Sequence, residues 1–322
     1  MKQVQKPARV CAIGGQAVME GVMMKAPSGI AMAVRRADGT IATEYTPYES
    51  KSKKGTFLGL PIVRGVVTFV EVLSLGMRTI TRSAELYGEE EVQSPSKFEE
   101  WLSKKTGKPV EKIAIGLAVV LALALSIGLF FMLPTFVSGL LLHKSSSSSF
   151  IKSVVEGLVR LLIFILYLAG ISALKDVRRI FMYHGAEHKV IACYEHEAPL
   201  TAESCRTFTR LHARCGTNYM FLVMAVSILF FAAVGFSSNF YMRLLTRLVF
   251  LPVVAGISYE VLRFAGKSDN LLARIVRAPG VALQRLTTRE PDDKMLEVAL
   301  AAFALATNPP AEVQETASVP AS

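Results

Sequence analysis

The chain has 322 residues, of which 52% are hydrophobic and only 19% are charged, and its formal net charge is +10. Ordinary soluble domains carry roughly 25% charged residues, so this composition argues against a soluble globular protein and favours an integral membrane protein. The positive charge does not indicate nucleic-acid binding, because no basic stretch is interleaved with aromatic side chains that could stack on bases.

Residues 1–54 predict a small glycine-rich N-terminal unit that contains a β-hairpin. The segment IAMAVRRADGTIATEY alternates around Asp38 and Gly39, a dipeptide that suits a tight turn because both positions tolerate positive φ. The preceding segment, GGQAVMEGVMMKAPSG, places Glu20 among four glycines, which suggests backbone packed closely against another part of the protein. It lacks the GxxxxGK[ST] spacing of a phosphate-binding loop.

Residues 55–112 predict an amphipathic helix followed by a linker. Arg64, Glu71 and Arg78 recur at steps of seven, which places the three charges in one stripe of an otherwise apolar helix. The simpler interpretation is a helix that lies at the membrane interface. The alternative is that the stripe faces the polar interior of the protein and helps to build a site. Residues 85–112 are rich in charge and predict an exposed linker.

Residues 113–264 predict a bundle of four transmembrane helices, so the expected fold is mainly α. Residues 113–142 and 216–242 carry no charge, and each stretch exceeds the roughly 20 residues that a helix needs to cross a bilayer. Residues 153–174 and 244–264 are weaker candidates because they contain charges. In residues 153–174, an acidic and a basic side chain one helical turn apart can form an ion pair that neutralises both charges. In residues 244–264, the charges lie near the ends of the span and can reach the membrane interface. Both segments therefore remain predicted spans.

The charges of the loops orient these spans. The loop of residues 175–218 contains seven basic residues, far more than the short loops at 145–149 and 237–239. By the positive-inside rule, the long loop and both termini are predicted to be cytoplasmic, where the net positive charge meets anionic lipid. Residues 265–306 predict further cytoplasmic helices, and residues 307–322 predict a disordered tail.

The long loop also concentrates the histidines and cysteines of the chain. Residues 184–215 hold four of the five histidines and three of the four cysteines. The HxxEH motif places His184 and His188 one helical turn apart, about 6 Å along the axis, where both could bind one divalent metal ion, with zinc favoured. Glu187 lies beside them and could accept a proton from a water bound to such an ion. Inverzincin metallopeptidases have the same order of residues.

The third ligand is left open by the sequence. His212 is favoured and Cys215 comes next, although a hydrogen-bonded turn before the following span would explain both residues equally well. Glu260 offers a further carboxylate near the end of the fourth span. Glu195 shares a helical face with His188 but lies about 10 Å further along the axis, so it can only support this site or belong to another.

Six segments together resemble a known family. They are GGQAVMEGVMMKAP, PIVRGVVTFVEVLSLGM, YHGAEHKVIACYE, RLHARCGTN, LPVVAGISYEVLRFAGK and LQRLTTREPDD. They are similar, in the same order, to signature segments of the YqhQ-like family, which consists of bacterial membrane proteins of unknown function. The resemblance implies a multi-pass protein of the bacterial inner membrane that belongs to a predicted metal-dependent class without an assigned substrate. When the segments are matched position by position, the resemblance implies that the following residues matter most for function: Glu20, Arg64, His184, Glu187, His188, Glu195, His212, Arg214, Cys215 and Glu260.

Two hypotheses for function follow. The first is a metal-dependent hydrolase in the membrane, facing the cytoplasm, with His184, His188 and His212 as ligands and Glu187 as general base. The second is a non-catalytic scaffold or transport-associated membrane protein in which the same polar residues are structural. In either case the lipid bilayer is a partner, and assembly into a homo-oligomer is compatible with both hypotheses.

Overall fold

The computed structural model describes most of the chain between residues 11 and 310. The described residues are 11, 13–52, 55–88, 101, 105, 107, 110–142, 148–235, 237, 239–267 and 270–310. Most of the predicted linker and most of the predicted tail lie outside these ranges. The chain divides into two compact units, one formed by residues 1–89, 168–223 and 252–322, and the other by residues 90–167 and 224–251.

The first unit begins with a four-stranded antiparallel sheet, in which the strands follow the order β1-β2-β3-β4. The strands are β1 (Gly14–Val18), β2 (Gly21–Ala26), β3 (Gly29–Arg35) and β4 (Ile41–Pro47). The predicted hairpin turn lies between β3 and β4, where Gly39 has a φ of +87° and Thr40 N donates to Asp38 Oδ1. The expected mainly helical fold with an N-terminal β-containing unit is therefore confirmed.

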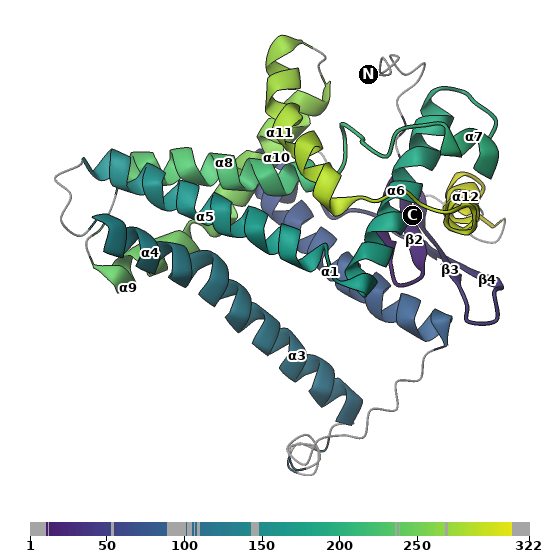
Figure 1. Ribbon diagram of the computed structural model, residues 1–322, viewed down its shortest axis with the longest axis horizontal. Coiled ribbons are helices and arrows are strands. Elements are labelled where there is room, and N and C mark those ends of the chain that lie inside the picture. The colour runs from purple at the N-terminus through teal and green to yellow at the C-terminus, as the bar shows by residue number, and fades with distance from the viewer. Residues whose placement is uncertain are drawn as a thin grey trace. The chain divides into compact units, whose positions relative to one another are not determined.

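Both faces of the sheet are covered, which explains why β2 and β3 are almost continuously apolar. On one face, Val22, Met24 and Ala33 join a core with residues of α6 (Lys175–Glu195) and α12 (Asp293–Thr307). Figure 1 shows α6 and α12 beside the strands. The other face packs against Leu75 and Leu86 of α1 (Val63–Tyr87).

The helix α1 follows a short 3₁₀ turn, η1 (Phe57–Gly59), and has the predicted amphipathic character. Its charged stripe has partners within the first unit: Arg64 forms a two-pronged ion pair with Glu260, and Glu71 accepts hydrogen bonds from Ser50 Oγ and Lys51 N. Large apolar side chains of α1 are exposed, namely Val70, Val72, Leu73, Met77 and Ile80.

Three helical stretches are long and apolar enough to cross a bilayer: Ile113–Leu142, Ser149–Ile171 and Thr217–Val234. The first comprises α3 (Val110–Ile127) from Ile113 onward, a π-helical segment, η2 (Gly128–Met132), and α4 (Leu133–Leu142). The other two are α5 (Ser149–Ile171) and α8 (Thr217–Val234). These three match predicted spans.

The fourth predicted span is a broken helix. It consists of α9 (Phe240–Val249) and α10 (Leu251–Lys267), which are bent by 45° relative to each other. The described residues therefore give three candidate spans, or four if the bent pair is treated as a single span. Pro252 in the first turn of α10 explains the break, because proline has no N–H for the helical hydrogen-bond pattern and its ring crowds the preceding turn. Among the described residues, the remaining helices are α7 (Ala202–Arg206) and α11 (Leu271–Thr287).

Candidate metal centre

The helix α6 carries the HxxEH motif on its buried stretch. Residues 185–193 are all buried, and Gly185 permits a close approach, because a Cβ atom at this position would lie 2.1 Å from the main-chain oxygen of Arg289. The chain after α11 therefore runs directly against α6, and Arg289 N donates to Phe181 O there. This contact brings the end of α11 within reach of the two histidines.

The two imidazoles are fixed by main-chain carbonyls. His184 Nδ1 lies 2.8 Å from Thr287 O, and His188 Nδ1 lies 2.6 Å from Arg210 O. A carbonyl oxygen only accepts hydrogen bonds, so each neutral ring carries its proton on Nδ1 and has a lone pair on Nε2. Metal-binding histidines typically have this arrangement, since the second nitrogen is held by a carbonyl or a carboxylate.

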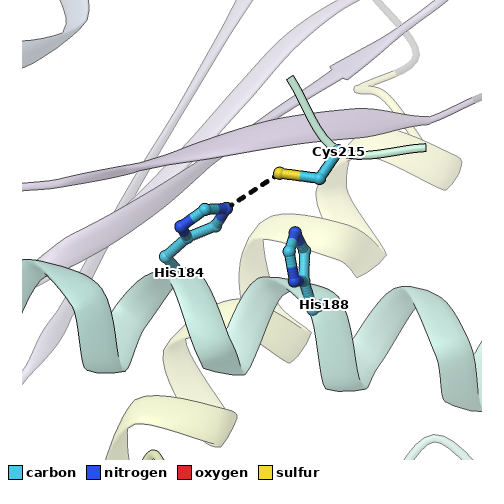
Figure 2. A group of neighbouring side chains, drawn as sticks. All are labelled: His184, His188 and Cys215. Carbon is cyan, nitrogen blue, oxygen red and sulfur yellow. Dashed lines mark hydrogen bonds between the residues drawn. The ribbon is translucent and has the colours of Figure 1, made fainter. Parts of the chain in front are cut away.

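Cys215, just before α8, lies opposite the two histidines. Its Sγ is 3.2 Å from His184 Nε2, and one potential ligand atom from each of His184, His188 and Cys215 lies within 4.8 Å of the others. Figure 2 shows both rings projecting from the same side of α6, with the Cys215 sulfur beside them. Thr217 donates to the sulfur from both its N–H and its hydroxyl, and these contacts fix the position of Sγ.

Two buried polar atoms at this group make no hydrogen bond within the described part of the chain. They are His188 Nε2 and Glu187 Oε2, and Glu187 Oε2 lies 3.9 Å from His184 Nε2. Burial lowers the pKa of His188, so this ring is neutral near pH 7 and the lone pair of its Nε2 can bind a cation. Buried polar atoms without partners are rare and call for an explanation, and a bound cation would provide one for His188 Nε2.

Glu187 faces the first strand of the sheet. A Cβ added to Gly15 would lie 3.2 Å from Glu187 Cδ, so β1 covers this carboxyl group. Burial raises the pKa of Glu187, although the nearby His184 and His212 and the Gly15 N–H partly oppose the shift. A carboxylate with a raised pKa is a better proton acceptor than an exposed glutamate.

His212, the favoured third ligand, lies beside this group and belongs to a second cluster. Its ring is 5.5 Å from that of His188, but its Nε2 lies 3.3 Å from Glu195 Oε2. Glu195 also accepts from Arg214 Nη2 and from Cys11 N. Burial opposes ionisation of Glu195, but these partners outweigh it and lower its pKa.

Gln284 of α11 fixes the segment that carries His212 and Cys215. Its Oε1 accepts from His212 N at 2.8 Å and its Nε2 donates to His212 O at 2.7 Å. The side chain is fully buried. Sequence reasoning did not single out Gln284 or the carbonyls of Thr287 and Arg210, although all three residues lie in the segments that resemble the family. A glutamine in a helix and main-chain oxygens form no motif of their own.

The other predicted site residues form separate ion pairs. Glu20, in the turn between β1 and β2, pairs with Arg179 of α6 and accepts a hydrogen bond from Tyr183 Oη. Burial, reinforced by the Glu20 charge, raises the pKa of Tyr183. Arg64 and Glu260 pair with each other, and neither belongs to the group that could hold a metal ion.

The fold and the site define a class: a multi-pass membrane protein with a four-stranded antiparallel sheet and a buried His/Cys group that could hold a metal ion. Residues 60–308 match the family model described as "Protein of unknown function (DUF1385)", and the chain belongs to this family. It is also 32% identical over 293 residues to "Uncharacterized protein YqhQ" of Bacillus subtilis (strain 168), and the aligned region covers 91% of each chain. These findings confirm the resemblance seen in the sequence. No solved structure matches the chain.

Proposed function

We propose that this protein is a membrane-bound, metal-dependent hydrolase whose metal ion is held by His184, His188 and Cys215. One observation carries the proposal: both Nδ1 atoms are occupied by main-chain carbonyls, while the Nε2 side of both rings meets the sulfur of Cys215. Imidazole and thiolate together suit zinc, and catalytic zinc sites typically use three protein ligands and keep one position open. The described residues supply three such ligands.

A zinc ion bound here would act as a Lewis acid and would favour ionisation of a water molecule at neutral pH. Glu187 Oε2 is the proton acceptor in this proposal, since it is buried beside the histidines and makes no hydrogen bond with another described residue. The cover provided by β1 excludes bulk solvent from this carboxyl group. Glu195, Arg214 and Gln284 hold the 210–215 segment in position rather than touching the reacting atoms.

Metal analysis tests the ligand set. We expect detergent-purified wild-type protein to retain about one divalent ion per chain, and the double variant His184→Ala/His188→Ala to lose it, because binding needs the whole set of ligands. Cys215→Ala should lose most of the metal, whereas His212→Gln should keep it. Cys205→Ala is the matched control, because it removes another buried thiol of the same region that lies outside the group.

Two results would count against this ligand set. Metal loss in His212→Gln with retention in Cys215→Ala would make His212 the third ligand, as the sequence favoured. Wild-type protein without metal after purification in metal-replete, chelator-free buffer would support the non-catalytic scaffold, in which the Glu20–Arg179 and Glu195–Arg214 pairs serve only to stabilise the fold.

The proposed site faces the cytoplasm, an orientation that rests on the basic loop of residues 175–218. Reporter fusions near residue 203 and at the C-terminus should therefore report a cytoplasmic location. Fusions at residues 147 and 238, which lie outside the described residues, should report the opposite side. An external reporter signal at residue 203 would reverse the orientation and place the site outside the cytoplasm.

A further inference from the structure

The second unit buries four charged side chains among its predicted membrane spans. Glu156 and Arg160 lie on α5, and Arg243 and Arg247 lie on α9. Glu156 is 0% exposed, and the three arginines are 6%, 6% and 2% exposed, respectively. Charged residues inside a membrane bundle are costly unless they are compensated, and they commonly mark a functional site.

The single carboxylate is shared by all three arginines. Glu156 Oε1 lies 3.1 Å from Arg160 Nη2 and 3.1 Å from Arg247 Nε, and its Oε2 lies 3.5 Å from Arg243 Nε. Guanidinium groups stay protonated in proteins, so the cluster carries a net charge of 3 − 1 = +2.

The following neighbouring groups, all in the described part of the chain, contact the arginines without carrying a full charge. Arg160 Nε donates to Phe130 O, a carbonyl that would otherwise accept from residue 134, and Pro134 has no N–H. Arg243 Nη2 donates to Thr135 O, and the Arg247 guanidinium lies 4.0 Å from the centre of the Phe231 ring. Carbonyls and aromatic rings carry only partial charges.

No further acidic side chain is available in these spans, because Glu156 is the only aspartate or glutamate in residues 113–171 and 217–251. A second source of negative charge must therefore come from outside these segments. An anionic ligand is the simplest source, since a buried charge without a counter-charge is strongly unfavourable.

A cavity beside the cluster can receive such a ligand. It has a volume of about 340 Å³ and is lined by Arg243 and Arg247 together with the hydroxyl-bearing residues Ser149, Ser237 and Thr246. It lies where α5 begins, α8 ends and α9 begins. These ends belong to candidate spans, so the cavity is placed at the depth where the headgroups of a bilayer lie.

We infer that this cavity binds a phosphate group, either the headgroup phosphate of an anionic phospholipid or a free phosphate ion. Guanidinium groups match the geometry of phosphate oxygens in two-pronged hydrogen bonds. The Ser237 hydroxyl, which accepts from Asn239 N, can donate its own proton to a remaining phosphate oxygen. A phosphate carrying one or two negative charges offsets part or all of the +2 charge of the arginine cluster. This site uses none of the residues of the proposed metal centre.

The test uses full-length protein that has been purified in detergent and stripped of lipid. Thermal unfolding is measured with added phosphatidylglycerol, with zwitterionic phosphatidylcholine and with inorganic phosphate. Phosphatidylglycerol should raise the Tm of the wild type more than phosphatidylcholine does. Arg243→Gln should require at least about ten times more phosphatidylglycerol for the same shift, which corresponds to the loss of about 1.4 kcal/mol.

Two further variants control for folding and for charge. Ser237→Phe keeps every arginine but fills the cavity, so it should lose the response even if Arg243→Gln does not fold. Lys152→Gln removes one positive charge from α5 without changing a residue that lines the cavity, and it should respond like the wild type.

The two phosphate sources are distinguished by the separate additions. A Tm shift with inorganic phosphate that is lost in Ser237→Phe, without a specific shift from phosphatidylglycerol, would identify free phosphate as the ligand and support the site. Equal shifts with both lipids and none with inorganic phosphate would overturn the inference. An unchanged response of folded Ser237→Phe would overturn it as well.

Discussion

Glu187→Gln should abolish the function of the protein in cells while its metal content stays at the wild-type level. The amide keeps the shape of the side chain, and His184, His188 and Cys215 remain available to hold the ion. An amide cannot accept the proton of a water molecule, and a general base is typically worth about 10²–10⁴ in rate. Complementation of a deletion strain measures function, and elemental analysis of the purified variant measures the metal.

Two controls make this result specific to Glu187. Glu203→Gln removes an exposed carboxylate from the same predicted cytoplasmic loop and should complement fully. His184→Ala should lose the metal and the function together. If Glu187→Gln complements fully while His184→Ala fails, Glu187 is not the base, and a structural metal ion or a hydrogen-bonded histidine pair explains the site better.

Gly185→Ala should destabilise the protein and release the metal ion of the proposed centre, although the residue is not one of the proposed ligands. The new Cβ would lie 2.1 Å from Arg289 O, so either α6 or the segment after α11 must move. Forced overpacking of this kind costs about 1–3 kcal/mol. The same segment begins beside Thr287, whose carbonyl orients His184, so the displacement should also disturb the proposed metal ligands.

Gly170→Ala is the matched control for this substitution. Gly170 lies in α5, and no heavy atom outside its own helix comes within 4 Å of the position of a new Cβ. Replacing glycine by alanine inside a helix stabilises by about 0.5–1 kcal/mol when there is room for the methyl group. Thermal unfolding should show a lower Tm for Gly185→Ala and an unchanged or higher Tm for Gly170→Ala. Wild-type stability and metal content in Gly185→Ala would show that the contact with Arg289 is unimportant.

Local sequence patterns determined several features of this protein. The Asp38–Gly39 turn depends on backbone preferences, and the uncharged stretches that form most of α3 and all of α4 and α8 depend on hydrophobicity; both act over neighbouring residues. The placement of His184 and His188 on one side of α6 follows from the fixed pitch of a helix. The break between α9 and α10 could have been inferred from Pro252, but the hydrophobicity of the whole stretch favoured a continuous span.

The surroundings of the histidines were decided only by the tertiary structure. His212 and Cys215 lie three residues apart in a segment without regular structure, where sequence spacing does not fix the direction of a side chain. Gln284 binds the main chain at His212, and Glu195 attracts its ring, while Cys215 comes close to His184. These partners lie 17 to 72 residues away along the chain. Their positions result from the packing of α6, α11 and the sheet, which no local pattern records, because packing depends on the shapes of all these surfaces at once.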